Sequence, residues 1–376
     1  MPTTVAINGR FLGRQATGVD RFAHEVVRCI DQLVAEQDPA TSGLSFELLV
    51  PPAVSVDAQQ FPHMQVRQVG RHVGRGGGQL WEQISLPLAA RGALLLNLCN
   101  AAPLLYPHQV TVMHDAAPVR VPQAYSRAFR SWYGVMAPWV GRVARRVLTV
   151  SEFSRRELAT AYRIPGRKIG VLPMSGDHML RLPESEDVRH KFGLSDRPYV
   201  LAVSSASYHK NFRLVADAIR MLGKVDYDVV IVGGGGRVFQ AVRDDQITES
   251  HDADGRVRRL GYVDDADLKA LFRGAGCFVF PSLYEGYGLP PVEAMTLGCP
   301  VLASSLPSVR EACGAAVLYF PPTRPRELGA LLTHVMQDSA LREKLREQGL
   351  ARVRPYSWRA TAARLLGEIS PWLPQR

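Results

Sequence analysis

The sequence is poor in cysteine, and its cysteines follow no recognisable pattern. They are odd in number, widely spaced and include no C-x-x-C pair: Cys29, Cys99, Cys277, Cys299 and Cys313. This arrangement argues against a disulfide framework and against a structural zinc site. We expect the cysteines to act as small buried hydrophobic residues.

Long apolar runs are also missing. No run approaches the roughly 18 residues that span a bilayer, and the first residues, MPTTVAINGRF, lack the features of a signal peptide. We therefore expect a cytoplasmic protein. The 376 residues, 46% hydrophobic and 21% charged, are too many for one core and suit two soluble α/β domains.

Acidic residues are in the minority, chiefly in the first half of the chain. Residues 1–180 contain 19 Lys+Arg against 12 Asp+Glu, a net charge of +7, and the rest contributes +3 to the total of +10. A basic half favours an acidic partner, which could be a phosphate-bearing acceptor, an anionic lipid surface or nucleic acid. A general preference for arginine, which supplies 39 of the 45 basic residues, explains the charge equally well.

Strand-like and helix-like stretches alternate along the chain. Residues 18–35 place apolar side chains at helical spacing. Two such series, joined by a polar stretch at 180–198, indicate doubly wound parallel sheets. We predict an α/β protein with Rossmann-like domains at 1–179 and 180–356, facing each other across a cleft that holds the ligand. A final helix at 357–376, opening at Ser357, is expected to pack back on the first domain.

The segment FVFPSLYEGYGLPPVEAMTLGCPV, residues 278–301, is the most informative one. An apolar strand is followed by a glycine-containing loop and by a helix that two prolines open and that Gly298 can close in the left-handed conformation. Glycines let backbone amides approach a ligand, and a helix N-terminus attracts phosphate. Glu285 and Glu293 can each accept hydrogen bonds from vicinal hydroxyls. Either glutamate alone is better explained as structural, but the combination predicts a nucleotide-sugar site.

The spacing of Glu285 and Glu293, with seven residues between them, resembles the E-x7-E signature of glycosyltransferase family 4, retaining enzymes of the GT-B fold. The likeness covers nearly the whole chain, because TGVDRF, HD, TVSEFS, HKN and GYV occur in the family's order. The resemblance implies that Glu293 holds the ribose hydroxyls of the donor and that Glu285 contributes to catalysis while holding the donor sugar. The backbone residues implied beside them are Gly286, Tyr287 and Gly288 for the sugar, and Leu289 and Pro290 for phosphate.

The motif SSASYHKNF contributes the cation of the implied site. By resemblance, Lys210 is the catalytic lysine that neutralises the leaving nucleoside diphosphate. The family often places an arginine where this chain has Ser204. That departure leaves open which group balances the charge of the second phosphate; His209 or a group of the first domain could contribute.

Three further motifs complete the implied site. Gly18, in ATGVDRF, begins a helix whose backbone could approach the diphosphate, and Tyr262 and Val263, in GYV, would receive the nucleobase. By resemblance, His114 in VTVMHDAAP lies at the reaction centre, and Asp115 could orient its imidazole. Each of these residues, taken alone, is explained as well by a structural role. The assignments therefore depend on the order in which the motifs occur.

Two D-x-D sequences resemble the metal motif of glycosyltransferases of another fold. Asp252–Asp254 follows no apolar strand, and Asp265–Asp267 opens a helix, where aspartate is a natural cap. We therefore expect no metal and no other cofactor, with Lys210 and helix-terminal amides in place of Mg²⁺. The glycines at 233–236 lack the G-x-G-x-x-G spacing, which leaves a nicotinamide oxidoreductase poorly supported.

Residues 125–146 interleave Trp132, Tyr133 and Trp139 with five arginines. This pattern suits a lipid headgroup layer or stacked bases, but also a core helix whose arginines reach solvent. The alternative functions are accordingly a basic membrane-surface or nucleic-acid binding protein, or a nucleotide-sugar epimerase of the same fold.

Taken together, these observations predict a retaining hexosyltransferase that uses a nucleotide-sugar donor, with GDP-mannose or a related donor as our hypothesis. The expected acceptor is a glycan or a polyprenyl-diphosphate-linked glycan in surface polysaccharide biosynthesis. We expect the domain at 1–179 to bind this acceptor and the domain at 180–356 to bind the nucleotide sugar. We expect peripheral contact with the inner membrane and no binding of nucleic acid.

Overall fold

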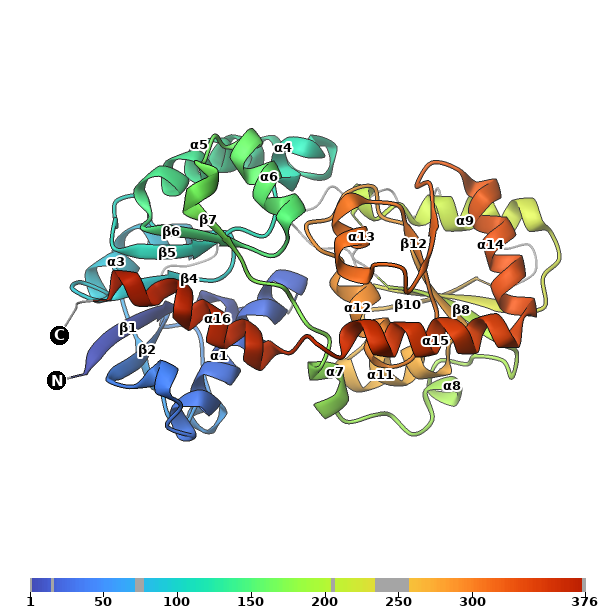
Figure 1. Ribbon diagram of the computed structural model, residues 1–376, viewed down its shortest axis with the longest axis horizontal. Helices are drawn as coiled ribbons and strands as arrows, with labels where there is room; N and C mark the ends of the chain where they lie inside the picture. Colours follow the sequence, from blue (N-terminus) through green and yellow to red (C-terminus); the bar gives the residue numbers. More distant parts are fainter. Residues whose placement is uncertain (1, 15–16, 72–77, 204–206, 234–256, 374–376) are drawn as a thin grey trace. The chain divides into compact units, whose positions relative to one another are not determined.

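The computed structural model describes residues 2–14, 17–71, 78–203, 207–233 and 257–373. The chain divides into two compact units, each built on its own parallel sheet (Figure 1). The first unit comprises Met1–Ala116, Ser131–Met174 and Ser357–Arg376, and the second comprises Ala117–Arg130 and Ser175–Tyr356.

The first unit contains a seven-stranded sheet in the order β3-β2-β1-β4-β5-β6-β7. Its strands are β1 (Thr3–Asn8), β2 (Leu44–Val50), β3 (Gln65–Gln68), β4 (Leu94–Asn97), β5 (Gln109–Val112), β6 (Arg146–Thr149) and β7 (Ile169–Val171). All neighbouring pairs are parallel. The chain runs outward from β1 to β3 and then resumes on the other side at β4. The switch point of this sheet, where open α/β sheets bind ligands, therefore lies between β1 and β4.

Two long helices of the first unit confirm their predicted positions. α1 (Gly18–Ala35) buries its apolar face, which includes Phe22. α16 (Trp358–Ile369) begins after Ser357, whose Oγ accepts from the Ala360 amide at 3.1 Å. Trp358 is 0% exposed, and its ring lies 5.8 Å from that of Phe22. The last helix thus completes the core of the unit that begins the chain.

The first unit also holds several shorter helices and one that it shares with the second unit. These are α2 (Gly78–Leu80), α3 (Leu86–Ala89), α6 (Glu152–Ala161) and α5 (Arg127–Val143), whose first residues belong to the second unit. α5 buries Met136 and Val140 in a core cluster against which Trp132 and Tyr133 pack. Trp139 is 47% exposed, and its Nε1 donates to the Leu104 carbonyl at 2.9 Å. One face of α5 is therefore buried in the core, and the indole of Trp139 is partly exposed on another face.

The second unit contains a six-stranded parallel sheet in the order β10-β9-β8-β11-β12-β13. Its strands are β8 (Tyr199–Val203), β9 (Asp228–Val232), β10 (Val257–Gly261), β11 (Cys277–Phe280), β12 (Val301–Ser304) and β13 (Leu318–Phe320). The switch point of this sheet lies between β8 and β11. The helices are α4 (Ala117–Arg120), α7 (His178–Arg181), α8 (Val188–Lys191), α9 (Phe212–Leu222), α11 (Asp265–Gly274), α12 (Leu289–Thr296), α13 (Pro307–Cys313), α14 (Pro325–Gln337) and α15 (Ser339–Val353).

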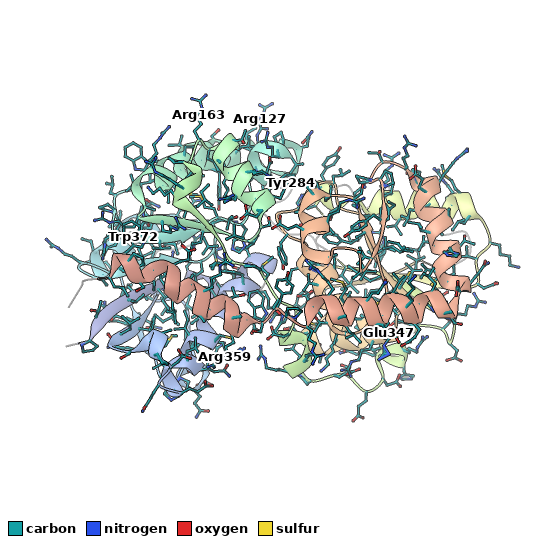
Figure 2. All side chains as sticks on the ribbon, in the orientation of Figure 1. Arg127, Arg163, Tyr284, Glu347, Arg359 and Trp372 are labelled. Carbon is teal, nitrogen blue, oxygen red and sulfur yellow. The ribbon has the colours of Figure 1, made fainter. Side chains whose placement is uncertain are left out.

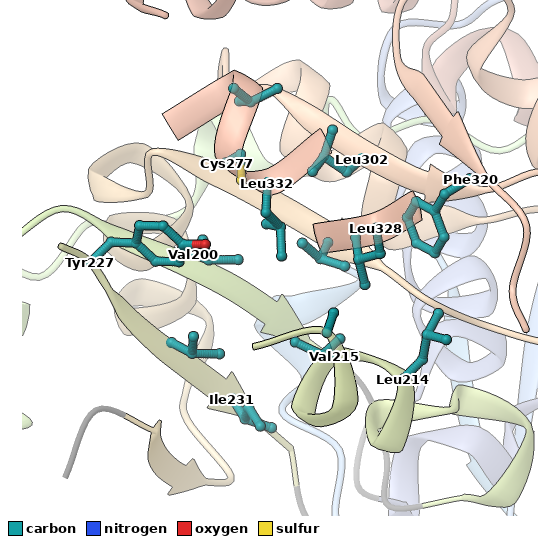
Figure 3. Packing of buried hydrophobic residues seen from close by; sticks show 14 of the residues in the cluster. Val200, Leu214, Val215, Tyr227, Ile231, Cys277, Leu302, Phe320, Leu328 and Leu332 are labelled. Carbon is teal, nitrogen blue, oxygen red and sulfur yellow. The ribbon is translucent and has the colours of Figure 1, made fainter. Parts of the chain in front are cut away.

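A core cluster joins one face of this sheet to α9 and α14. Figure 3 shows Val200 and Ile231 of the sheet beside Leu214 of α9 and Leu328 of α14. The strand residues of this cluster alternate along the chain, and its helix residues recur at helical spacing. Both element types could therefore be predicted here.

The polar stretch 180–198 belongs to the second unit and does not behave as a linker. Ser185 Oγ and Lys191 Nζ each donate to the Asp267 carboxylate at 2.6 Å, and Lys269 Nζ donates to the Leu182 carbonyl at 2.7 Å. The Asp267 carboxylate is thereby engaged within the unit, and the cap of α11 is Asp264, whose side chain accepts from the Asp267 amide at 2.9 Å. Asp252–Asp254 lies outside the described residues.

The cysteines confirm the expectation of buried thiols in four of five positions. Cys29, Cys277, Cys299 and Cys313 are buried and free, and Cys99 is partly exposed. Burial raises the pKa of Cys277 and of Cys313 to about 12. Among the described residues, no helix combines the length and apolar character that crossing a membrane requires.

Candidate functional site

The switch point of the second sheet brings together two of the predicted residues. Lys210 lies in a short turn (Tyr208–Lys210) beyond β8, and Glu285 lies in the loop beyond β11. Lys210 Nζ donates to Glu285 Oε1 at 2.7 Å, and both side chains are largely buried. Although 75 positions separate them in the chain, their strands are neighbours in the sheet. The contact therefore follows directly from the strand order.

Electrostatics fix the ionisation of this pair and of its neighbour His209. Burial alone would raise the pKa of Glu285, but Lys210 and His209 hold it below its usual range. Burial, aided by the Lys210 charge, lowers the pKa of His209 to about 4. His209 is therefore neutral near pH 7 and does not supply the second cation that the sequence left open.

The loop between β11 and α12 is held by contacts with separate parts of the second unit. Asn211 Nδ2 donates to the carbonyls of Pro281 and Pro322 at 2.9 and 2.8 Å, and Ser308 Oγ donates to the Glu285 carbonyl at 2.7 Å. The Leu283 amide donates to the His209 carbonyl at 2.7 Å. Sequence reasoning noted the HKN motif but missed this role of Asn211, which adopts the left-handed conformation that asparagine tolerates (φ 56°).

Gly288 and Gly298 mark the two ends of α12. Gly288 precedes the helix with φ 109°, a conformation that L side chains rarely adopt, and Gly298 follows it with φ 74°. The prediction that Gly298 closes the helix in the left-handed conformation is confirmed. Leu289 and Pro290 begin α12. Because Pro290 and Pro291 have no N–H group, the Leu289 amide is the backbone donor of this first turn, which also carries a partial positive charge just past the loop that holds Glu285.

Glu293 lies on α12 and contacts a histidine that the sequence did not single out. His178, on α7, places Nε2 3.1 Å from Glu293 Oε1, and both side chains are nearly inaccessible. The close approach of α7 to α12 depends on Gly176, since a Cβ there would lie 2.4 Å from Thr296 Oγ1. The sequence contains no signal for His178, because it lies far from Glu293 in the chain and forms no recognisable motif with it.

The remaining predicted residues of the second unit are more dispersed. Gly286 and Tyr287 lie in the loop with Glu285, and Tyr287 is buried. Tyr262, 63% exposed, and Val263, buried, follow β10, which β9 separates from β8. The structure thus does not place these two on a strand adjoining Lys210. Ser204 lies outside the described residues.

In the first unit, His114 follows β5 and is almost completely buried (4% exposed). Its Nε2 lies 3.0 Å from the Leu98 carbonyl, its amide donates to Asn100 Oδ1 at 2.7 Å, and the Phe22 ring meets it edge-on at 5.0 Å. The Leu98 carbonyl and the Phe22 ring orient the imidazole. Burial lowers the pKa of His114 to about 4, so the ring is neutral near pH 7.

Gly18, the first residue of α1, lies next to a group of polar residues that sequence reasoning missed. Asn8, the last residue of β1, donates to Glu82 Oε1 at 3.2 Å and to Asn97 Oδ1, at the end of β4, at 3.1 Å. Arg10 forms an ion pair with Glu82. Asp20 accepts from the amide and hydroxyl of Thr17 at 3.1 and 2.7 Å, which ties it to the start of α1. These residues come from separate segments with no common motif, but all lie at the switch point of the first sheet.

Within the part of the chain that the structure describes, no three His, Cys, Asp or Glu side chains gather as metal ligands would. The donors that do converge at the second switch point are one ammonium group and the amino end of α12. Such groups can bind a phosphate.

Comparison with known proteins identifies relatives for part of the chain. Residues 184–352 match the family described as Glycosyl transferases group 1. The O-antigen chain mannosyltransferase B of Escherichia coli is 34% identical over 224 residues, which are 57% of this chain and 58% of that protein. The O-antigen chain mannosyltransferase RfbU of Salmonella typhimurium is 27% identical over 244 residues, 65% of either chain. The alignments thus leave more than a third of each relative unmatched, and they support a glycosyltransferase.

Solved structures match nearly the whole chain. A sucrose-phosphate synthase from Thermosynechococcus elongatus has a TM-score of 0.74 at 17% identity and covers 98% of both chains. HepE of Anabaena, crystallised with UDP-glucose, has a TM-score of 0.72 at 15% identity, covering 97% of this chain and 98% of that one. At such identities the likeness shows the fold, and it confirms the predicted GT-B class of two Rossmann-like domains.

Proposed function

We propose that this chain is a retaining glycosyltransferase of family 4 that moves a hexose from a nucleoside diphosphate sugar to a glycan acceptor in surface polysaccharide synthesis. The observation that carries the proposal is the contact of Lys210 with Glu285. Two separate segments bring a cation and a carboxylate to one switch point, beside a helix whose first turns contain Glu293. Mannose is the proposed hexose, because both relatives described above are mannosyltransferases.

Each group at this switch point has a proposed task. Lys210 stabilises the charge on the departing diphosphate as the anomeric bond breaks, Glu293 accepts from the ribose hydroxyls, and Glu285 accepts from the sugar hydroxyls. Because Lys210 contacts Glu285 at 2.7 Å, donor binding must exchange this partner for a phosphate oxygen. The loop amides of Gly286, Tyr287 and Gly288 and the helix start at Leu289 and Pro290 surround the sugar and the phosphates.

The other predicted residues keep their proposed roles. Tyr262 and Val263 receive the nucleobase, Ser204 adjoins the diphosphate without adding charge, and the backbone at Gly18 approaches the diphosphate. His114 lies at the reaction centre as a neutral ring. Its Nε2 faces the Leu98 carbonyl and therefore carries the hydrogen, so this nitrogen does not serve as a general base.

We also propose that transfer needs neither a metal nor another cofactor. Lys210 and the amino end of α12 supply the positive charge that a divalent ion would otherwise provide. Full activity after dialysis against EDTA would agree with this role, whereas loss of activity that Mg²⁺ or Mn²⁺ restores would contradict it.

Donor binding is the direct test of the proposal. Thermal denaturation of the purified protein with GDP-mannose, other sugar nucleotides and free nucleoside diphosphates should reveal one stabilising base. A ligand at a hundred times its Kd adds about 2.7 kcal/mol to the free energy of unfolding. Glu293→Ala should abolish the shift, while Glu327→Ala, an exposed glutamate on α14, should keep it. Absence of stabilisation by every sugar nucleotide would sink the proposal.

Product analysis separates transfer from the alternative activity. An epimerase would convert the sugar nucleotide with no acceptor present, whereas a transferase releases nucleoside diphosphate and glycosylates the acceptor. Proton NMR of the new glycosidic bond should show the anomeric configuration of the donor. Inversion would refute the retaining mechanism.

The acceptor is proposed to be a glycan or a polyprenyl-diphosphate-linked glycan, reached by peripheral contact with the inner membrane. Supporting this contact, α5 exposes Val135, Trp139 and Arg142 at helical spacing, and Arg145 just beyond the helix is also exposed, a combination suited to anionic headgroups. Arg127, at the start of the same helix, extends outward in Figure 2. The protein should float with vesicles that contain anionic lipid, and Trp139→Ser should reduce flotation. Flotation that does not depend on anionic lipid would count against the arginine contacts.

A further inference from the structure

The contact of His178 with Glu293 places a buried imidazole against the carboxylate that is proposed to hold the ribose. Nε2 of His178 lies 3.1 Å from Oε1 of Glu293, and the two side chains are 1% and 11% exposed. Among the described residues, no lysine or arginine forms an ion pair with Glu293. A carboxylate with so little access to water is costly unless a neighbouring polar group supports it. In this site that neighbour is the imidazole of His178.

The chain segment that carries His178 is fixed directly against the backbone of α12. A Cβ at Gly176 would lie 3.1 Å from the Cα of Glu293, closer than a Cβ normally approaches a backbone atom. The absence of a side chain at Gly176 therefore permits this approach. Ser175 Oγ donates to the Tyr356 carbonyl at 3.1 Å, which ties the same segment to the end of α15 and its following turn. The imidazole is thus held from behind by a rigid backbone contact.

A fixed imidazole has a consequence for the carboxylate beside it. A glutamate side chain has three rotatable bonds, and a ligand that must order them loses part of its binding energy. A carboxylate that is already held at one oxygen avoids this loss and presents its other oxygen in a defined direction. The contact at Oε1 therefore prepares Glu293 to accept from hydroxyl groups of a ligand.

We propose that His178 is a positioning residue for donor binding, which holds Glu293 in the conformation that accepts from the ribose hydroxyls of the nucleotide. This inference rests on the proposed function and deepens it by adding a residue that acts without touching the substrate. Because His178 acts through Glu293, its removal should weaken the recognition of ribose and leave the contacts to the base and the diphosphate intact.

The test measures how strongly the protein prefers a ribose that carries its hydroxyl groups. Calorimetry on the full chain compares GDP and UDP with their 2′,3′-dideoxy counterparts. Wild type should bind the ribose form of its nucleotide about tenfold to a hundredfold more tightly, because the dideoxy form lacks the hydrogen bonds to a charged group. His178→Phe keeps a planar ring without nitrogen and should reduce this preference by weakening the ribose form alone. His178→Gln, whose amide supplies a donor, should restore most of the preference.

Two comparisons separate positioning from a general effect on folding. Glu293→Ala should lose the preference, and adding His178→Phe to it should change nothing further, because residues that act as one unit are not additive. His190→Phe, at an exposed histidine of the same unit, should keep the wild-type preference. A His178→Phe protein that retains the full preference, or that binds the ribose and dideoxy forms equally more weakly, would overturn the inference.

If His178→Phe does not fold, the wild-type protein still tests the contact. The imidazole signals of 15N-histidine-labelled protein, assigned with His178→Gln, should shift when the ribose nucleotide binds and shift less with the dideoxy form. A His178 signal that neither nucleotide moves would overturn the inference. Wild type that binds neither GDP nor UDP nor any sugar nucleotide contradicts the glycosyltransferase itself. Nucleotide binding whose preference for ribose does not depend on His178 contradicts only the positioning role.

Discussion

The two switch points of the molecule differ in how their charges are arranged. At the second switch point, the ammonium group of Lys210 pairs with Glu285, and on the helix that follows, Glu293 contacts His178. At the first switch point, Arg10 forms an ion pair with Glu82, and the buried Asp20 Oδ1 has no hydrogen-bond partner among the described residues. One fold, used twice, thus surrounds its two switch points with different arrangements of charge.

The largest expected effect concerns the packing that supports the first edge. Trp358→Ala removes a fully buried indole next to Phe22 and should lower the free energy of unfolding by about 3–5 kcal/mol. Urea denaturation measures this loss. If the two edges are built independently, the folded variant still binds the nucleotide through the second unit. A nucleotide affinity that falls in step with stability would break the comparison.

Lys210→Ala tests the second edge alone. Loss of a preorganised charge at the leaving group should reduce kcat by about 10²–10³-fold, measured by release of nucleoside diphosphate. Acceptor binding, which we expect in the first unit, should not change. Lys224→Ala, at an exposed lysine of the same unit, provides the control and should retain full activity.

Acidification should affect both edges similarly, because each contains a buried histidine whose pKa is lowered, His114 at the first and His209 at the second. His114 and His209 have pKa values of about 4 when folded, below the usual 6.5, so the unfolded chain binds more protons and stability falls as pH drops from 7. Each histidine should cost about 2 kcal/mol between pH 7 and pH 5. Glu285, with its lowered pKa, contributes only below this window. Urea titrations of wild type, His114→Gln and His209→Gln at both pH values should show each variant losing a share of the pH dependence, and an unaltered dependence would refute the assignment.

The smallest expected effect separates the two tasks of the Lys210–Glu285 pair. Glu285→Gln frees Lys210 from its partner, while the amide keeps the shape of the side chain. Nucleoside diphosphate should therefore bind several-fold more tightly, although transfer is lost with the sugar contact. Calorimetry with the diphosphate alone measures this gain. Weaker binding would show that the carboxylate does not compete with phosphate.

The second edge could be predicted from sequence because its chemistry is local. Glu285 and Glu293 lie in one strand–loop–helix segment whose glycines and prolines have recognisable conformational roles. The first edge could not, since Asn8, Glu82 and Asp20 belong to different segments and meet only through the strand order. The contacts of His178 and Asn211 were not predicted for the same reason, because their partners lie in other segments of the chain.

The fold was readable wherever hydrophobic spacing was regular. The helix 18–35 and the strand segments match the structure, because amphipathic periodicity follows directly from burial of one face. The interpretation of residues 180–198 as a linker was wrong, because polar side chains of this stretch form hydrogen bonds within the second unit. Ser185 and Lys191 both donate to the buried Asp267 carboxylate. Polarity alone does not distinguish a solvated segment from one that pairs with a buried charge.

The position of α16 has a consequence for how the chain is made. Trp358 packs under Phe22, yet more than three hundred residues separate them, and most of the second unit lies between. When the strands of the first sheet have left the ribosome, α16, which packs against α1, has not yet been synthesised. The second unit should therefore mature first during synthesis, while the earliest part of the chain waits with an open hydrophobic face and depends on chaperones until its final turns emerge.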